Sequence, residues 1–210
     1  SGEDVHMAVA AEVFGIPRSE VTKEMRRRAK AINFGMLYGM GVNSLRQSIG
    51  GTREEAETFY KKYFTRFSRL TEYLEGVKAS VARKGYTETF FGRRRAFEAI
   101  TSKIPYIRAA AERMAINAPI QGTQSDIIKL AMVRIDAFLQ KEGLGDRTAL
   151  ILQVHDELVY EIEEGLVTQV APKLKHFMEG VLSLEETKGV PIVVDVAVGK
   201  NWGEMKKMQS

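Results

Sequence analysis

Two adjacent carboxylates in the stretch ALILQVHDELVYEI (residues 149–162) are the strongest candidates in the chain for a chemical role. Asp156 and Glu157, preceded by His155, separate two apolar runs that predict a pair of buried strands joined by a tight turn. If both carboxylates stay ionised about 5 Å apart, they repel each other by about 3 kcal/mol at an effective dielectric constant of about 20, so a cation is needed nearby. Carboxylate oxygens on a rigid turn are suitable ligands for Mg²⁺. The hairpin therefore predicts a magnesium site.

A metal-dependent phosphohydrolase of the histidine-aspartate type is an alternative interpretation of His155 and Asp156. That chemistry needs further histidines on helices, and the only others, His6 and His176, are not in a plausible place. The chain has no cysteine, which excludes disulfides and thiolate metal sites, and its histidines are too scattered for a zinc site. Any metal is therefore expected to be a hard cation held by carboxylates.

Two cations and two aromatic residues share one face of a helix predicted from Ser19 or Thr22 to about Tyr38. Arg26, Lys30, Phe34 and Tyr38 are spaced four residues apart, so they climb one face over about 18 Å. Cations at one end and rings at the other suit a nucleoside triphosphate, with phosphates on the cations and a ring on the base. The alternative is a solvated basic end followed by aromatic residues that face the core.

A second polar series recurs at the same spacing in an alanine-rich segment. Arg113, Asn117 and Gln121 carry side chains that bind base edges and backbone oxygens, so a nucleic-acid duplex groove is a plausible occupant. The alternative is a polar helix face in water. The segment FGRRR (residues 91–95) is similarly open to two interpretations, a phosphate-contacting turn or a solubilising surface.

The elements that must position these residues predict an α+β fold. Helices are expected over residues 4–15, from Thr52 as one long amphipathic stretch to Gly85, and near residues 166–180. A strand pair turns at Gly92, and the alanine-rich helix from residue 107 should break before Pro119 and resume over residues 125–142. Two predictions complete this scheme: a last strand over residues 190–198, and antiparallel pairing of the strands.

Composition is consistent with a globular chain that meets polyanions in one part and holds cations in another. The 210 residues are 44% hydrophobic and carry a formal net charge of +4. Six basic residues and one acidic residue lie within residues 22–46, whereas nine acidic and three basic residues lie within residues 151–198. No apolar stretch approaches the roughly 20 residues of a membrane span, and no signal peptide is recognisable. We therefore expect a cytoplasmic location and no membrane partner.

Four motifs, in this order, resemble those of family A DNA polymerases, the bacterial DNA polymerase I type. RRRAKAINFGMLYG (residues 26–39) resembles the nucleotide-binding helix of the family's fingers, and QVHDELVYE (residues 153–161) resembles its palm hairpin. AERMAINAPIQGTQSDIIKLAM (residues 111–132) and GKNW (residues 199–202) are also similar. The resemblance implies a helical fingers subdomain at residues 3–104, followed at residues 105–210 by the C-terminal part of an antiparallel-sheet palm.

The same resemblance implies a role for each candidate residue. Arg26 and the catalytic Lys30 contact the incoming deoxynucleoside triphosphate, Phe34 packs on its sugar, and Tyr38 lies near the template base. A phenylalanine at Phe34, rather than a tyrosine, implies discrimination against sugars without a 3′-hydroxyl. The remaining assignments concern DNA and metal: Arg113, Asn117 and Gln121 follow the minor groove of the primer-template, His155 lies near the primer terminus, and Asp156 binds two catalytic Mg²⁺ ions with Glu157 beside it.

One departure from the family concerns a second catalytic aspartate, which the family carries on a palm strand before the fingers. Because this sequence begins after that point, we expect the chain alone to be inactive and to need an upstream polymerase segment, which could be a separate chain. Two alternatives stay open, a noncatalytic DNA- or nucleotide-binding module derived from a polymerase and a fragment of a single-subunit RNA polymerase. For the polymerase, the expected location is the bacterial cytoplasm, at the nucleoid.

Overall fold

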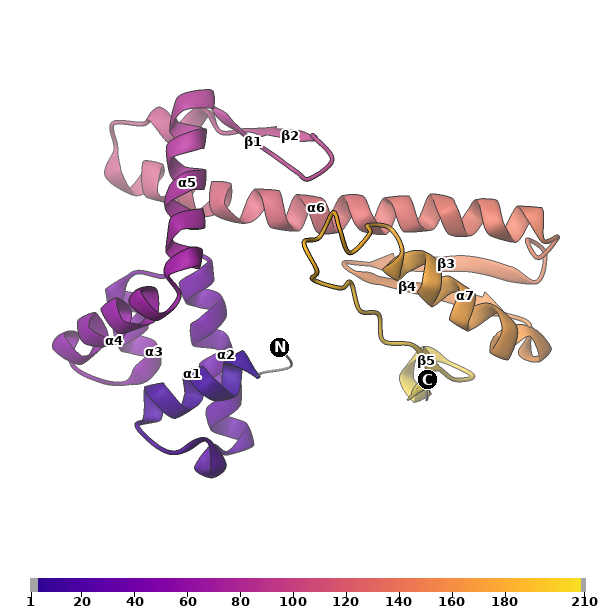
Figure 1. Ribbon diagram of the computed structural model, residues 1–210, viewed down its shortest axis with the longest axis horizontal. Helices are drawn as coiled ribbons and strands as arrows, with labels where there is room; N and C mark the ends of the chain where they lie inside the picture. The colour runs from indigo at the N-terminus through magenta and orange to yellow at the C-terminus, as the bar shows by residue number, and fades with distance from the viewer. Residues whose placement is uncertain (1–3, 209–210) are drawn as a thin grey trace. The chain divides into compact units, whose positions relative to one another are not determined.

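The computed structural model describes residues 4–208 and consists of helices with three small two-stranded sheets (Figure 1). The chain divides into two compact units, residues 1–120 and residues 121–210. The division lies inside helix α6 (Pro105–Lys141), whereas the predicted subdomain boundary between residues 104 and 105 lies at the start of this helix. All three sheets are antiparallel, as predicted.

The first unit begins with helices whose ends follow from their capping residues. Helix α1 (Val5–Phe14) starts at the side chain of Asp4 and ends at Gly15, whose φ of 64° is in the left-handed region that favours glycine. Helix α2 (Lys23–Leu37) starts at Thr22, whose hydroxyl accepts a hydrogen bond from the backbone N–H of Met25. Both helices therefore occupy the predicted segments. A short 3-10 helix (Arg18–Glu20) connects them, and α3 (Val42–Ile49), which was not predicted, follows.

The long helix predicted up to Gly85 is wrong, because it is two helices. Helix α4 (Arg53–Arg66) begins with the predicted capping box of Thr52 and Glu55, and α5 (Ser68–Lys84) begins after Phe67. Phe67 leaves the helical region (φ −103°, ψ 51°), and its ring packs 4.8 Å from that of Tyr63. The hydroxyl of Thr71 donates to the carbonyl of Phe64 at 3.0 Å, which satisfies an acceptor near the break.

The core of the first unit is formed by the inner faces of α1 to α4. Its fully buried members include Val9, Ile32, Met36 and Leu45, with Tyr63 contributing from α4. Phe59, Phe64, Phe67 and Leu70 pack against this cluster, so this part of the amphipathic stretch contributes its aromatic side chains to the core.

A β-hairpin follows α5 in the predicted place. Strands β1 (Tyr86–Glu88) and β2 (Arg94–Ala96) pair, and Gly92 in their turn has a φ of 83°. A short 3-10 helix (Glu98–Thr101) then leads into α6. A second buried cluster contains Val81 of α5, Phe97, Ile100 and alanines of α6, so the end of the hairpin packs against α5 and α6.

The predicted break at Pro119 is also wrong, because α6 runs without interruption from Pro105 to Lys141. A proline inside a helix removes one backbone hydrogen bond and costs about 3 kcal/mol. Apolar side chains on both sides of the proline are buried, however, including Ala111 and Ala115 before it and Ala131 and Ile135 after it. Burial of these faces favours one continuous helix despite the local cost.

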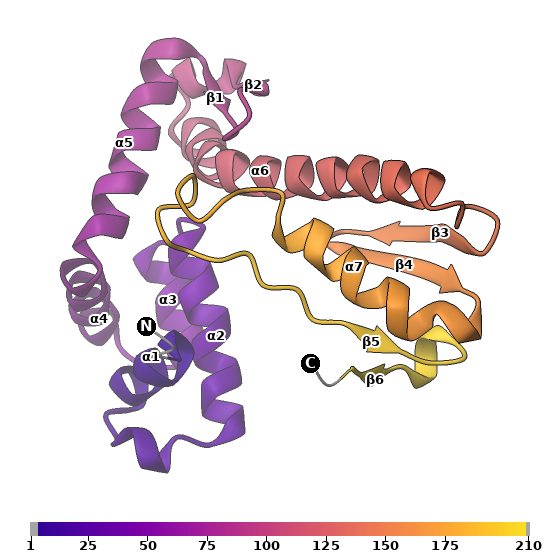
Figure 2. The same ribbon diagram turned by 45° about the vertical axis from the view of Figure 1, so that its right-hand side comes forward.

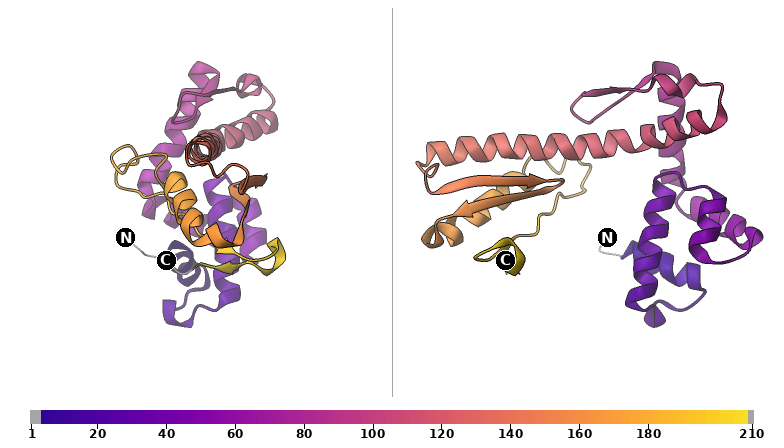
Figure 3. Two further views of the ribbon diagram at one scale, coloured as in Figure 1. Left: turned by 90° about the vertical axis from the view of Figure 1, so that its right-hand side faces the viewer. Right: turned by 180° about the vertical axis from the view of Figure 1, so that it is seen from behind.

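In the second unit, a hairpin of β3 (Thr148–Val154) and β4 (Glu157–Ile162) lies along the C-terminal half of α6, and α7 (Val167–Glu179) packs beside it (Figures 2 and 3). Ile135, Leu139, Val170 and Leu174 form the buried centre of this packing. Leu158, Tyr160 and Ile162 of β4 pack against that centre.

The prediction that both strands of this hairpin are buried is wrong for β3. Leu150, Ile151 and Leu152 are 37%, 57% and 40% exposed. A two-stranded sheet covered by helices on one face leaves its other face open, and a register shift between Leu150 and Leu152 disturbs the alternation of side chains. The apolar composition of β3 therefore does not report burial within this chain.

The chain ends with a segment in which little of the predicted last strand is paired. Only Ala197–Val198 (β5) is paired, with Lys206–Lys207 (β6), while the backbone N–H of Val194 is held by the carboxylate of Glu179 at 3.0 Å. Short 3-10 helices at Glu164–Leu166 and Trp202–Glu204 complete the unit. Within residues 4–208, no helix has the length and apolar composition required to span a membrane.

Candidate functional site

The predicted face of α2 exists and is open to solvent. Ile32 and Met36 face the core, whereas Lys30, Phe34 and Tyr38 are exposed, the two rings by 38% and 39%. The rings stack with centroids 6.1 Å apart and an interplanar angle of 21°, and the ammonium of Lys30 lies 5.7 Å from the centre of the Phe34 ring. The alternative in which the aromatic end faces the core is therefore wrong.

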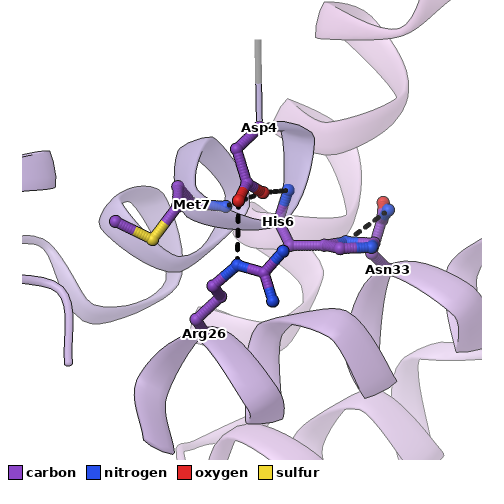
Figure 4. A network of polar contacts seen from close by, with 5 residues as sticks. All are labelled: Asp4, His6, Met7, Arg26 and Asn33. Atoms are coloured by element: carbon purple, nitrogen blue, oxygen red, sulfur yellow. Dashed lines mark hydrogen bonds and ion pairs between the residues drawn. The ribbon is translucent and has the colours of Figure 1, made fainter. Parts of the chain in front are cut away.

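Arg26 lies at the basic end of this face and is held by a carboxylate from α1. Its Nε donates to Oδ2 of Asp4 at 2.8 Å, and the other oxygen of Asp4 accepts the backbone N–H groups of His6 and Met7 (Figure 4). The hydrogen bond from Arg26, followed by that from the Met7 backbone, lowers the pKa of the Asp4 carboxyl below its usual value. Asp4 is therefore a stable anion beside the first cation of the face.

His6 belongs to the same site, although no sequence pattern predicted its place there. Its ring centroid lies 5.6 Å from that of Phe34, and its Nδ1 lies 3.3 Å from Nδ2 of the buried Asn33 (Figure 4). Since the Tyr63 hydroxyl donates to Oδ1 of Asn33 at 2.5 Å, the amide nitrogen donates to His6, and the imidazole proton is assigned to Nε2. Partial burial, and then the charge of Arg26, lowers the pKa of His6 and favours its neutral form.

The polar series on α6 lies on consecutive turns because the helix is continuous. Arg113 and Gln121 are exposed, and the aliphatic part of Arg113 lies against Gly39, just after α2. The side-chain oxygen of Asn117 is enclosed by protein and accepts no hydrogen bond from residues 4–208. Arg113 is thus next to the aromatic end of α2, and Asn117 retains an unused acceptor.

The carboxylates at the β3–β4 turn are positioned by a two-residue connection of His155 and Asp156. His155 has a φ of 50°, which is uncommon for a residue with a side chain, and Nε2 of Gln153 donates to its carbonyl oxygen at 2.7 Å. Glu157 opens β4, so only Asp156 of the predicted carboxylate pair is in the turn itself. All three turn-proximal residues, His155, Asp156 and Glu157, are exposed.

These carboxylates fit Mg²⁺ as a partial ligand set. Neither Asp156 nor Glu157 has an ion-pair or hydrogen-bond partner among the described residues, so their oxygens are available. In the same part of the chain there is no group of three or more histidine, cysteine, aspartate or glutamate side chains that could hold a metal. Mg²⁺ is commonly held by one or two carboxylates together with substrate phosphates and water. The hairpin can therefore contribute to a magnesium site that a substrate completes.

The arginines of FGRRR are partly committed to contacts within the first unit. Arg94 donates to Glu88 at 2.8 Å and lies 4.6 Å from the centre of the Tyr86 ring, while Arg95 lies 5.2 Å from that of Phe97. The motif is therefore in part structural.

Comparison with known proteins places these features in one family. The sequence model described as DNA polymerase family A matches residues 1–204. The chain belongs to DNA polymerase family A. It is 49% identical to DNA polymerase I of Pseudomonas aeruginosa (strain PAO1) over 201 residues, which are 96% of this chain and 21% of that protein. It is 43% identical to the thermostable DNA polymerase I of Thermus aquaticus over 206 residues, 98% of this chain and 24% of that protein.

A solved relative supports the same family A assignment at the level of the fold. The structure described as "POL domain of Pol1 from M. smegmatis complex with DNA primer-template and dNTP" matches with a TM-score of 0.81 and 40% identity, over 90% of this chain and 32% of that chain. The predicted fold class, α+β as an incomplete part of a polymerase domain, is therefore confirmed. This family A chain spans between a fifth and a quarter of the length of the two curated relatives.

Proposed function

We propose that this chain is the C-terminal part of a DNA-directed DNA polymerase that adds deoxynucleotides to a primer 3′ end. The observation that carries the proposal is the solvent-exposed face of α2, on which two cations precede two stacked rings. The solved relative, a polymerase domain in complex with primer-template DNA and a deoxynucleoside triphosphate, supports the same substrates here. In this proposal, residues 3–104 are the fingers and residues 105–210 are part of the palm, and the protein acts on DNA in the cytoplasm, at the nucleoid.

The face of α2 would bind the incoming nucleotide. Arg26 and Lys30 neutralise the triphosphate, and this stabilisation grows as charge develops on the leaving pyrophosphate. Phe34 packs on the sugar, and Tyr38 lies near the template base. Because Phe34 has no hydroxyl group to replace a missing 3′-hydroxyl of the sugar, the site should favour nucleotides that carry one.

The polar series on α6 would contact the primer-template. Arg113 and Gln121 are exposed, and both carry N–H donors that can bond to acceptors on the minor-groove edges. Asn117, which lies between them on the helix, would donate through its amide nitrogen, since its enclosed oxygen is an acceptor. The minor groove offers acceptors at similar positions in every base pair, so such contacts would report pair geometry more than sequence. This suits an enzyme that must copy any template.

The β3–β4 turn would supply carboxylates to the reaction centre. Asp156, with Glu157 beside it, would hold Mg²⁺, and His155 would lie near the primer terminus. When bound, two such ions lower the pKa of the attacking hydroxyl and stabilise the leaving group in an in-line displacement. The hydrogen bond from Gln153 to the carbonyl oxygen of His155 holds the turn, and therefore its carboxylates, in place, as the strict geometry of a metal site requires.

Two carboxylates are fewer than this chemistry needs, so we propose that a further aspartate comes from another polymerase segment. Primer extension with Mg²⁺ tests this. Residues 1–210 alone should be inert, addition of a polypeptide carrying the family's other palm strands should restore extension, and Asp156→Ala should abolish it. Extension by residues 1–210 alone would refute the need for a further carboxylate.

The same assay separates the alternatives. A noncatalytic binding module would bind DNA in a salt-sensitive way that Asp156→Ala leaves unchanged, and no added segment would produce extension. A preference for ribonucleotides in the reconstituted enzyme would instead indicate an RNA polymerase.

A further inference from the structure

The carboxylate of Asp4 has two simultaneous tasks. Its Oδ1 accepts the backbone N–H groups of His6 at 3.0 Å and Met7 at 3.1 Å, which caps α1, and its Oδ2 accepts from Nε of Arg26 at 2.8 Å (Figure 4). Because the cap holds one oxygen, the other cannot move far from Arg26 without leaving the start of the helix uncapped. Arg26 is therefore bound to a fixed anchor.

The anchor uses only one of the three guanidinium nitrogens. Among the described residues, hydrogen bonds to the Arg26 guanidinium involve Nε alone, so both Nη groups remain available. The two neighbouring arginines are engaged differently. Arg27 makes a two-point contact with Glu24, and Arg28 donates to the carbonyl of Ser48 at 3.3 Å. Arg26 is thus the arginine of this run that lies on the face of Lys30 with donors to spare.

Stability does not explain this ion pair well. The side chains of Arg26 and Asp4 are 42% and 41% exposed, and ion pairs at such positions contribute little to folding. Orientation is the more important consequence, because a guanidinium binds phosphate best when two N–H groups point at it in parallel. A free arginine side chain must lose its rotamer freedom to reach that geometry.

We propose that Asp4 is a positioning residue of the nucleotide site, which holds Arg26 through Nε and so presents its two Nη groups to a phosphate. This inference rests on the proposed function of α2. The opposite role would be a counterion that occupies Arg26 until a phosphate displaces it. The capping bonds argue against displacement, since they keep the carboxylate in place when a ligand arrives.

The two roles predict opposite effects of Asp4→Asn on anion binding. Asparagine caps a helix as well as aspartate does, so α1 should stay intact while Arg26 loses its anchor. We expect the affinity of the 210-residue chain for inorganic tripolyphosphate and for dTTP to fall by about tenfold, the scale of one charge-assisted hydrogen bond. Isothermal titration calorimetry measures both affinities, and the Arg26 Nε–H resonance reports the anchor directly.

A matched control removes the same charge without touching Arg26. Glu24→Gln, at the start of α2, removes a carboxylate that pairs with Arg27, so the charge changes by the same amount while Arg26 keeps its anchor. Its effect should be a small gain in anion affinity. In an Arg26→Ala background, Asp4→Asn should have no further cost, because Asp4 acts through Arg26.

The outcomes distinguish this inference from the function on which it rests. If the unmodified chain binds dTTP but Asp4→Asn leaves its affinity unchanged or increases it, the positioning role is refuted and the nucleotide site stands. An equal loss in the Arg26→Ala background also refutes it. If the folded, unmodified chain binds neither tripolyphosphate nor dTTP, both the nucleotide site and the positioning role are refuted.

Discussion

The side chain of Arg113 packs directly on Gly39, so a Cβ atom at Gly39 would lie 2.8 Å from Cγ of Arg113. Gly39 also has a φ of 79°, which a residue with a side chain rarely adopts. The close approach joins the aromatic end of α2 to the first residue of the polar series on α6. Two proposed ligand contacts of the first unit, Tyr38 and Arg113, therefore depend on one glycine.

Gly39→Ala should destabilise the chain more than the same change at another left-handed glycine. Gly50 is the matched control, because its φ is 76° and a Cβ there would have no neighbour within 4 Å. Both changes cost about 1–2 kcal/mol for the backbone conformation, and Gly39→Ala should cost roughly 1–3 kcal/mol more for the overlap with Arg113. Urea unfolding measures the difference. An Arg113→Ala background should abolish the excess, and equal losses at the two glycines would contradict the contact.

Tyr63→Phe should lower the free energy of unfolding by about 1–3 kcal/mol. The change leaves Oδ1 of the buried Asn33 without its donor, and an unsatisfied buried acceptor carries that cost. Tyr60→Phe is the control, since the Tyr60 ring packs on Phe64 and should tolerate the loss of its hydroxyl. Thermal and urea unfolding provide the measurement. Equal effects of the two substitutions would show that the Tyr63–Asn33 bond does not stabilise the fold.

Alkaline pH should destabilise the native state through the same tyrosine. Burial raises the pKa of the Tyr63 phenol from 10.0 to about 12, so the unfolded chain loses this proton first. Below pH 10 the contribution is complete, and between pH 10 and 12 the free energy of unfolding should fall by about 1.4 kcal/mol per pH unit. Tyr63→Phe should reduce that slope when unfolding is followed at several pH values. Part of the slope should remain, because burial also raises the pKa of Tyr160 to about 12.

Phe34→Tyr should reduce discrimination against dideoxynucleotides. The added hydroxyl would lie on the exposed rim of the ring stack, where it can replace the missing 3′-hydroxyl of the sugar. Because Phe34 is 38% exposed, the folded state should change in stability by no more than about 0.5 kcal/mol. The ratio of deoxy- to dideoxynucleotide incorporation by the reconstituted enzyme provides the test, with Tyr38→Phe as the control. A ratio that Phe34→Tyr leaves unchanged would argue against contact between this ring and the sugar.

Mg²⁺ should bind weakly to the chain alone and more tightly when a nucleotide is present. Asp156 and Glu157 supply only part of a coordination shell, and phosphate oxygens would supply more of it. Calorimetric titration with Mg²⁺, with and without dTTP, measures the change, and Asp156→Asn should abolish the gain. Tight stoichiometric binding of Mg²⁺ without nucleotide or DNA would contradict a partial site.

Local signals in the sequence predicted much of the fold, because they act over a few residues. The caps at Thr22 and Thr52 and the glycines at residues 15, 85 and 92 place helix ends and turns correctly. The break at Phe67 and the continuity through Pro119 were not predictable in this way. Both depend on side chains that become neighbours only after folding, and these contacts outweigh the local preference of the backbone.

In the candidate site, too, local sequence patterns predicted some residues, and other residues join the site only through contacts made on folding. Spacing of four residues on one helix was enough to group Arg26, Lys30, Phe34 and Tyr38, and the hairpin was recognisable from its two apolar runs. His6 and Asp4 were missed, because they reach the site from another helix and their partners are 27 and 22 residues away in the sequence. The one local signal was Asp4 itself, because aspartate is a favoured helix cap and therefore indicates that a helix starts at this position.

The exposed apolar side chains of β3 have a practical consequence for any work with this chain. A two-stranded sheet with Leu150, Ile151 and Leu152 exposed offers both apolar surface and unpaired backbone edges to other molecules. At high concentration the chains should self-associate through this strand, so apparent affinities would depend on protein concentration. A charged residue at Ile151, which is the most exposed of the three, should raise solubility without disturbing the helices behind the hairpin.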